Sequence, residues 1–249
     1  MAREIREIPE LVRYKYRHIG TQWTDDQIEL PSNKIFYTVV AIMRANPPHI
    51  NHTLMLRELC DQAVNVKLNL GSANKFDKKN PFRIEEREEM MRLALDGYKN
   101  FELLRLPDVD NDELWFKNLR EINDSFTEIL SNNSYDLNIY RKNQYAPGKD
   151  KIEHNRNYDI IQPTDIIDQK RMRYVTGVVE DGATFLKAKK PTYISGTLVR
   201  TGMVNNWNWE GFVDPKVAEY LKKSDLVTRL RKLCPDLKGK TLADLYEGR

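Results

Sequence analysis

Two histidines, His49 and His52, stand three residues apart in the stretch RANPPHINHTLM (44–55), directly after an apolar run. The run predicts a strand and the apolar spacing after it predicts a helix, so the pair lies where a strand turns into a helix. A helix N-terminus offers unpaired backbone N–H groups and a positive dipole end, which suit an anion. Imidazoles placed there can donate hydrogen bonds to phosphate oxygens and stabilise charge on a phosphoryl group under attack.

Two other interpretations fit a His-x-x-His pair taken alone: surface side chains, or part of a metal site. A zinc site needs more ligands nearby, whereas the neighbouring residues are Asn, Thr and Arg. We therefore predict no metal held by protein ligands here. Cys60 and Cys234 stand far apart in apolar helical patterns, which favours two buried thiols over a disulfide.

Strand-like and helix-like segments alternate along the chain and predict the frame that positions the histidines. The expected strands are 34–43, 64–73, 101–107, 135–141 and one near 174–180. The expected helices are 52–64, 112–131, 214–223 and 225–234. One more is expected to begin after an N-cap at Asn80, with Pro81 at its first position, and to end at Gly97. Residues 144–170 are polar and predict a loop or an inserted hairpin.

This alternation predicts an α/β fold, a doubly wound Rossmann-like parallel sheet with helices on both faces. In such sheets ligands bind beyond the carboxyl ends of the strands, where the histidines are placed. We divide the chain into an N-terminal extension (1–33), the Rossmann-like domain (34–213) and a C-terminal helical extension (214–249).

The bulk composition narrows the classes of partner. A net charge of +3 over 249 residues does not indicate a coat for a nucleic-acid polymer. No apolar run approaches the roughly 20 residues of a membrane helix, so no membrane partner is expected. The N-terminus lacks the apolar core of a signal peptide, and the cytoplasm is the expected location.

The stretch RANPPHINH resembles the (H/T)-x-G-H motif of the HIGH-type nucleotidyltransferases. The whole pattern is most similar to the archaeal-type nicotinamide-mononucleotide adenylyltransferases. In that family a strand leads into G-R-F-x-P-x-H-x-G-H, which this chain matches at Arg44, Pro47, His49 and His52.

Four further segments resemble motifs of the same family in the same order. GSA (71–73), followed by NPF (80–82), Glu86 and Arg87, matches G-S-A and N-P-F-x-x-x-E-R. PDVDNDELW (107–115) resembles P-D-I-x-x-N-x-x-W, and YRKN (140–143) loosely matches the Y-S-G-N that follows the fourth strand. YISGTLVR (193–200) resembles I-S-x-T-x-x-R, so the five motifs span roughly residues 34–203.

The resemblance implies transfer of AMP from ATP to nicotinamide mononucleotide, which gives NAD and pyrophosphate. It assigns the triphosphate to His49, His52 and Arg200, with His52 nearest the transferred α-phosphate. The other residues that it implies for ATP phosphates are Arg44, Asn51, Ser195 and Thr197. Those that it implies for the acceptor are Ser72, Asp108, Asp112, Trp115 and Asn143. A Mg²⁺ ion that bridges phosphate oxygens, with few protein ligands, is the expected cofactor.

Three roles stay open at this point. Trp115 either stacks on the nicotinamide ring or is a core aromatic residue of its helix. Asp108 either orients the ribose of the ligand or caps the following helix. Lys75, Lys78 and Lys79 either touch phosphates or form a solvated loop face, and the second role is favoured.

Several residues depart from the family pattern. Met43 and Asn51 replace glycines, although asparagine tolerates the left-handed backbone that glycine provides. Asp112 replaces the usual Asn, and Arg141 and Lys142 replace two small residues beside the expected base-binding loop. These changes bear on the choice of acceptor more than on the phosphate chemistry.

Two rival functions therefore remain. One is a related cytidylyltransferase or adenylyltransferase that acts on another phosphorylated acceptor. The other is a non-catalytic nucleotide-binding module. Relatives assemble into multimers, so a homo-oligomer is an option, but one sequence shows no interface.

Overall fold

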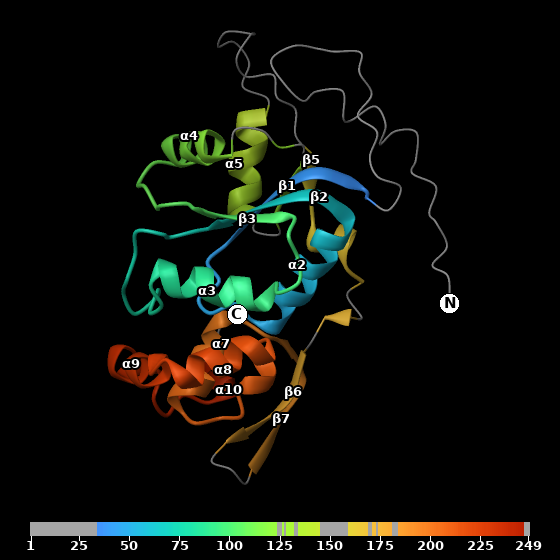
Figure 1. Ribbon diagram of the computed structural model, residues 1–249. Coiled ribbons are helices and arrows are strands. Elements are labelled where there is room, and N and C mark those ends of the chain that lie inside the picture. The colour runs from blue at the N-terminus through green and yellow to red at the C-terminus, as the bar shows by residue number, and fades with distance from the viewer. Residues whose placement is uncertain are drawn as a thin grey trace, which may run out of the picture.

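The centre of the fold is a five-stranded sheet, seen in a computed structural model that describes residues 34–123, 126, 128–131, 134–144, 159–168, 171–172, 174–180 and 184–246 (Figure 1). The strands are β1 (Phe36–Met43), β2 (Ala63–Leu70), β3 (Phe101–Arg105), β4 (Glu128–Leu130) and β5 (Asp159–Ile161). They lie in the order β3-β2-β1-β4-β5, and every pair is parallel. The predicted doubly wound parallel sheet is confirmed. The expected extension 1–33 lies outside the described residues.

Helices cover both faces of this sheet. On one face α2 (Ile50–Gln62), α3 (Ile84–Ala94) and the short α6 (Pro163–Ile166) share a core with Val39 and Ala41 of β1. On the other face α4 (Asp112–Ile122) and α5 (Ser134–Gln144) share a core with Val40. Alternate side chains of a strand point to opposite faces, so an apolar residue at every position marks a strand buried on both sides.

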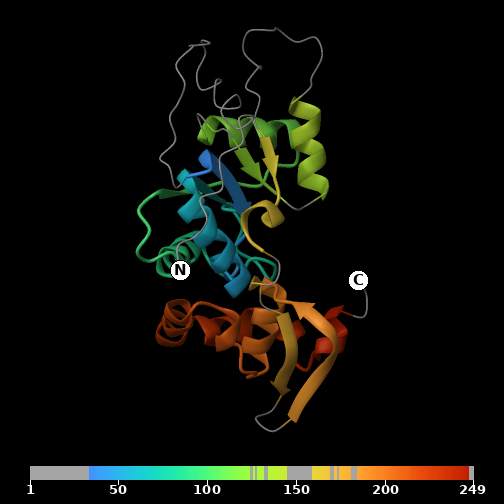
Figure 2. The ribbon, with the colours of Figure 1, turned by 90° about the vertical axis from the view of Figure 1, so that its right-hand side faces the viewer.

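A third core lies beyond α3 and belongs to the C-terminal helices. These are α7 (Gly196–Val204), α8 (Pro215–Lys223), α9 (Leu226–Leu233) and α10 (Leu242–Tyr246), with the short 3₁₀ turns η3 (Glu210–Phe212) and η4 (Pro235–Leu237). Met90 and Ala94 of α3 are buried in this core, whereas Met91 faces the sheet. Helix α3 is therefore the link between the sheet and the C-terminal helices, as Figures 1 and 2 show.

The segment 135–141, expected as the fourth strand, is instead the body of α5. The fourth strand is β4, only three residues long, inside the stretch 112–131 that we expected to be one helix; α4 ends at Ile122. The error has a physical reason. Leu137 and Ile139 alternate as in a strand, but Tyr140 is also buried and completes a helical stripe at i, i+3. β4 is short and begins with the charged Glu128, so its sequence does not show the apolar run that predicts a buried strand.

Helix α3 begins later than expected, at Ile84 with Arg83 as N-cap. Asn80 does not cap it but lies in a preceding turn, in which its backbone N–H donates to the Asp77 side chain at 2.8 Å. The first turn is instead closed by Glu86, whose carboxylate accepts the Arg83 backbone N–H at 2.8 Å. Gly97 has φ of 94°, the left-handed backbone that a terminating glycine supplies.

The expected strand near 174–180 is confirmed as β6 (Tyr174–Glu180), but it pairs antiparallel with β7 (Thr184–Tyr193) in a separate two-stranded sheet (Figure 2). The expected irregular stretch 144–170 contains β5 and α6. Cys60 and Cys234 are both buried and free, as predicted. Of the helices that the structure describes, none is long and apolar enough to cross a membrane.

Candidate functional site

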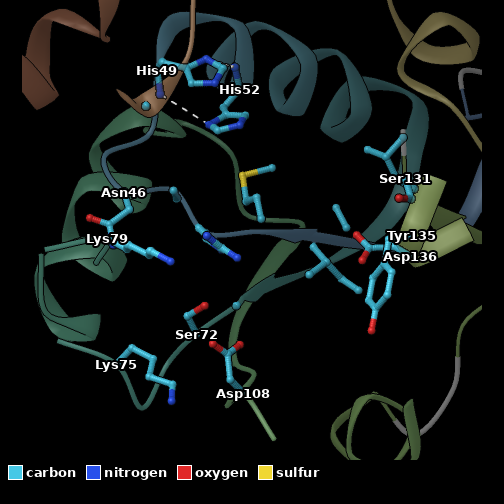
Figure 3. Close-up of a pocket in the computed structure, with 18 of the residues that line it drawn as sticks. Asn46, His49, His52, Ser72, Lys75, Lys79, Asp108, Ser131, Tyr135 and Asp136 are labelled. Atoms are coloured by element: carbon cyan, nitrogen blue, oxygen red, sulfur yellow. Dashed lines mark hydrogen bonds between the residues drawn. The ribbon is translucent and has the colours of Figure 1, made fainter. Parts of the chain in front are cut away.

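A cavity of about 800 Å³ opens beyond the carboxyl ends of β1, β2 and β4 (Figure 3). Ten of the predicted site residues line it: Arg44, His49, Asn51, His52, Ser72, Asp108, Asp112, Trp115, Thr197 and Arg200. Residues separated by most of the chain thus meet in one space. Ser195 is not part of this lining, and the side chain of Asn143 lies outside what the structure describes.

The two histidines cap helix α2 through each other. The His52 backbone N–H donates to Nδ1 of His49 at 3.4 Å, and the His49 backbone N–H donates to Nδ1 of His52 at 3.5 Å. This is a reciprocal capping box in which imidazoles replace the usual Ser and Glu. The rings stack with their centroids 3.5 Å apart (Figure 3). Their three-residue spacing is therefore a requirement of the helix start as well as of the site.

Burial sets the charge of both rings, and the capping bonds set which nitrogen carries the proton. Burial lowers the pKa of His49 well below its ordinary value, and the neighbouring His52 lowers it further. Burial lowers the pKa of His52 to about 4. Both imidazoles are therefore neutral near pH 7, and because each Nδ1 accepts a hydrogen bond, the ring proton sits on Nε2. Both rings line the cavity.

Arg200 brings helix α7 to this corner. Its Nη1 donates to the Asn46 carbonyl at 2.5 Å and its Nη2 to the Thr197 hydroxyl at 3.1 Å. Burial lowers the pKa of Arg200 from its ordinary value, and the nearby charge of Arg44 lowers it further. Two guanidinium groups that face one cavity repel each other, and an anion bound between them relieves this repulsion.

Helix α7 starts at the cavity wall, and Gly196 makes the approach possible. A Cβ at this position would lie 3.3 Å from the Asn46 carbonyl oxygen and 3.4 Å from Nη1 of Arg200. The Ser195 hydroxyl caps the helix by accepting from the Leu198 N–H at 3.2 Å, and its contact with phosphate stays a prediction. Ser195 thus shapes the helix start while Thr197 lines the cavity.

Asn46 was missed by the sequence interpretation and connects three parts of the site. Its side-chain oxygen accepts from the Phe82 N–H at 3.3 Å, its amide nitrogen donates to Asn80 at 3.5 Å, and its carbonyl accepts from Arg200. The side chain is 4% exposed. No local pattern marks Asn46, because its partners lie 34 to 154 residues away in the sequence.

Arg87 ties the ends of β1 and β2 together from inside the protein. It is fully buried, and its guanidinium donates to the carbonyls of Arg44 at 2.8 Å, Gly71 at 2.7 Å and Ser72 at 3.0 Å. Burial lowers its pKa from the ordinary arginine value. The motif that contains Arg87 therefore supports the corner from behind and does not touch the cavity.

At this corner Ala45 and Ser72, and not Asn51, adopt the left-handed backbone conformation. Asn51 lies inside the first turn of α2, so the proposed left-handed asparagine is wrong. Ala45 has φ of 47° and Ser72 has φ of 53°, one after each of the two central strands. Non-glycine residues rarely adopt this conformation, and it is tolerated where the surrounding structure fixes it. Here the Arg87 bonds to Arg44 and Ser72 fix it.

Carboxylates and aromatic side chains line the part of the cavity away from the histidines. Asp112 accepts a hydrogen bond from the Tyr135 hydroxyl at 2.5 Å, and Asp136 lies beside Tyr135 (Figure 3). Trp115 is half-buried, stacks on Tyr140 at 6.4 Å and also lines the cavity. One side of the indole thus packs on the core while part of it faces the cavity, and stacking on a nicotinamide ring stays a prediction.

Asp108 does not cap the following helix. That cap is Asn111, whose side chain accepts from the Leu114 N–H at 2.8 Å. The Asp108 backbone N–H and carbonyl bind the side chain of Asn74, at 2.9 Å and 3.1 Å. Its carboxylate is left at the cavity (Figure 3), where it can meet a ligand.

The YRKN segment does not follow the fourth strand, so this part of the motif reading is wrong. Residues 140–143 lie in the last turns of α5, and the segment after β4 begins at Ser131. The side chain of Asn143, like those of Arg141 and Lys142, lies outside what the structure describes. Ser131, Tyr135 and Asp136 line the cavity instead.

Lysines of the loop after β2 are exposed, as a solvated loop face requires, and two of them also line the cavity. Lys75 and Lys79 contribute to the lining, and Figure 3 shows both beside Ser72 and Asn46. Lys78 lies elsewhere, 3.9 Å from Asp236. Among the described residues no group of three or more His, Cys, Asp or Glu could hold a metal ion.

No protein-family profile matches the chain. Two curated relatives are each called nicotinamide-nucleotide adenylyltransferase. The one from Pyrococcus furiosus is 27% identical over 202 residues, 79% of this chain and 88% of the relative. The one from Picrophilus torridus is 24% identical over 193 residues, 76% of this chain and 93% of the relative. The similarity to nicotinamide-nucleotide adenylyltransferases expected from the motifs is confirmed.

Solved structures show the same fold. A crystal structure of a bifunctional NMN adenylyltransferase/ADP ribose pyrophosphatase from Francisella tularensis superposes with a TM-score of 0.55 at 18% identity. The match covers 81% of this chain and 53% of that one, so this chain spans about half the length of the bifunctional protein. A second structure of that enzyme, complexed with AMP and a Mn ion, matches with a TM-score of 0.51.

Proposed function

We propose that this chain is a nucleotidyltransferase that transfers AMP from ATP to nicotinamide mononucleotide, giving NAD and pyrophosphate. The observation that carries the proposal is the placement of two neutral imidazoles, Arg44 and Arg200 around one cavity at two helix starts. Relatives called nicotinamide-nucleotide adenylyltransferase match over 76–79% of the chain and support the choice of substrates.

The reaction needs placement and charge more than covalent help. An oxygen of the acceptor's phosphate attacks the α-phosphorus of ATP, and the bond from that phosphorus to the oxygen bridging to the β-phosphorus breaks as pyrophosphate leaves. No general base is required, because the attacking phosphate is already an anion. The side chains must hold the two phosphates in line and stabilise charge on the departing oxygens.

Different residues bind different phosphates of ATP, according to where they lie in the cavity. His49 and His52 donate Nε2–H to the α-phosphate region at the start of α2, where the helix dipole adds to the attraction. Arg200, Arg44 and the loop lysines hold the β- and γ-phosphates. Thr197 orients Arg200 through its hydroxyl.

The acceptor occupies the opposite part of the cavity. Trp115 offers a flat face to the positively charged nicotinamide ring, and Asp112 and Asp108 lie beside it. Ser72 lies between the two ligands, at the end of β2. These carboxylates favour a cationic ring, which distinguishes nicotinamide mononucleotide from acceptors that carry further negative charge.

Mg²⁺ is the cofactor that fits this site. Such an ion keeps most of its waters and is held through substrate phosphates, so the lack of a three-ligand cluster among the described residues is compatible with it. When bound to the triphosphate it neutralises charge on the phosphate oxygens.

The test is a substrate panel. Purified protein is incubated with MgATP or MgCTP and with nicotinamide mononucleotide, nicotinate mononucleotide or a phosphorylated alcohol, and pyrophosphate release is followed. Release with ATP and nicotinamide mononucleotide, together with NAD in the product, is the expected result. Release only with another nucleotide or acceptor would point to the rival transferase, and ATP binding without any release to a non-catalytic module.

A further inference from the structure

The loop that joins β2 to α3, residues 71–83, carries two cavity-lining lysines, Lys75 and Lys79. It has no strand or helix of its own before Ile84. Its own side chains fold it locally: the Asp77 carboxylate accepts the backbone N–H groups of Lys79 and Asn80, each at 2.8 Å. A turn of this kind fixes its own shape, and the Asn46 side chain ties Asn80 and Phe82 near its end to the site corner.

Helix α9, more than 140 residues away in the sequence, adds a second hold on the loop through Arg229. The Arg229 guanidinium donates to the Pro81 carbonyl at 3.2 Å and lies over the Phe76 ring, 5.4 Å from its centroid. It also binds both carboxylate oxygens of Glu86, one of them at 2.6 Å. One side chain thus contacts the loop at two points and the first turn of α3 at a third.

A second contact from the end of α9 reaches the part of the loop between these points. The buried thiol of Cys234 donates to the Lys78 carbonyl at 3.5 Å. Together Arg229 and Cys234 hold the backbone on both sides of Lys79. The C-terminal helices therefore brace the loop from the side opposite the cavity.

The charges explain why Arg229 acts on position and not on the ligand directly. Arg229 is not part of the cavity lining, and its side chain is 29% exposed. Burial disfavours the charged form of Glu86, but the hydrogen bonds from Arg229 and from the Arg83 backbone outweigh it and leave the pKa of Glu86 below its ordinary value. The Arg229 charge is thus balanced by a partner on α3, and the attraction for an anion comes from the lysines.

We propose that Arg229 is a positioning residue: through Phe76, Pro81 and Glu86 it holds Lys75 and Lys79 where they meet the β- and γ-phosphates of the nucleotide. The C-terminal segment is by this inference a support of the nucleotide site. The inference rests on the proposed function for the identity of the ligand as a triphosphate.

The test uses inorganic tripolyphosphate with Mg²⁺ as the probe, and the full chain. Arg229→Ala is compared with Arg231→Ala, a matched control on the same helix, because Arg231 donates to the Met203 carbonyl at 3.1 Å and to Asn206, away from the loop. Supporting groups one contact removed from a ligand typically change affinity by about tenfold or more. We expect a rise of that size in the Kd of tripolyphosphate for Arg229→Ala and none for Arg231→Ala.

A double-mutant cycle separates positioning from general destabilisation. If Arg229 acts through Lys79, Arg229→Ala will have little further effect in a Lys79→Ala background. In the enzymatic assay the KM for ATP should rise about tenfold while the KM for nicotinamide mononucleotide stays the same, and Arg229→Lys should restore part of the loss. Should Arg229→Ala fail to fold, Phe76→Ala removes the same stacking contact from a side chain that is 46% exposed.

Each outcome decides something. Wild-type-like binding of tripolyphosphate by Arg229→Ala or Phe76→Ala, or additive effects in the cycle, would overturn the inference and leave the proposed function intact. Tripolyphosphate binding that depends on Arg229, without pyrophosphate release from any substrate, would overturn the function alone. A wild-type protein that does not bind tripolyphosphate would overturn both.

Discussion

His49 and His52 present the same ring atom to the cavity because the other nitrogen of each ring holds the backbone of its partner. A donor is thereby fixed without a third residue to orient it. Serine hydroxyls could cap the helix equally well, but they would not reach a phosphate. The pair thus serves the helix and the ligand with different atoms of the same side chains.

Two substitutions of His52 separate these tasks. His52→Asn keeps an acceptor near the Nδ1 position but removes the donor at Nε2, whereas His52→Gln places an amide nitrogen nearer Nε2. Loss of one electrostatic donor costs about 10²–10³-fold in kcat. We expect a loss of that size for His52→Asn with little change in Tm, and a smaller loss for His52→Gln. Steady-state rates and thermal melts check this, and an unaltered kcat in His52→Asn would remove the residue from the site.

The lowered histidine pKa values also predict how stability depends on pH. In the unfolded chain both rings titrate near the ordinary value of about 6.5, whereas the folded pKa of His52 is about 4 and that of His49 is also lowered. Between these values the unfolded state binds more protons, so stability is lost as the pH falls from about 6.5. Each ring contributes up to about 1.4 kcal/mol per pH unit.

Urea unfolding from pH 7 to pH 5 checks this, in a range where most carboxylates stay ionised. The expected result is a steady fall in the free energy of unfolding. His52→Asn is the control and should show a shallower slope. An equal slope in the two proteins would mean that His52 titrates normally in the folded state.

At the scale of elements, the corner depends on Arg87 of α3, which satisfies carbonyls at the ends of two strands. Arg87→Met leaves these carbonyls buried without their donor, at a cost of about 1–3 kcal/mol for an unsatisfied group. We expect the free energy of unfolding to fall by about 3 kcal/mol or more, together with activity.

Arg92→Met on the exposed side of the same helix is the matched control, with an expected change within about 0.5 kcal/mol. Chemical denaturation measures both. A small effect in Arg87→Met would show that the strand ends hold their shape through other contacts.

The sequence predicted those elements whose periodicity is strong and local. β1 is apolar on both faces and leads into the histidine corner, so both its burial and its role as a site could be expected. β4 and α5 could not be placed correctly, because a three-residue strand with a leading glutamate carries no pattern of its own.

The sequence predicted those site residues that belong to one of the family motifs. Asn46 and Arg229 escaped because their roles come from partners far away in the chain. Long-range contacts of this kind leave no spacing in a single sequence.

At the scale of the molecule, the cavity has a positive and a negative part. Lys79 and Arg200 line the side where we propose the triphosphate, whereas Asp112, which accepts from the Tyr135 hydroxyl, and Asp136 line the other. This division orients the two substrates before any specific contact forms. It also predicts which acceptor is preferred.

A nicotinate mononucleotide carries one more carboxylate than its amide counterpart and meets these aspartates unfavourably. Two like charges about 6 Å apart at an effective dielectric constant of about 40 repel by about 1.4 kcal/mol, or tenfold in rate. We expect kcat/KM to favour nicotinamide mononucleotide, and Asp112→Asn to reduce the preference by up to that factor. Competition between the two acceptors, read by chromatography of the products, measures it.

Glu113→Gln, exposed on the same turn of α4, is the control and should leave the preference unchanged. If Asp112→Asn also leaves it unchanged, the carboxylate does not face the ring.

The bond from Arg200 to the Asn46 carbonyl spans 154 residues of sequence. During synthesis the segment with His49 and His52 leaves the ribosome long before Arg200, which completes the site. A nascent chain can therefore form the sheet while it still lacks a nucleotide pocket, and only the finished polypeptide can handle its substrates.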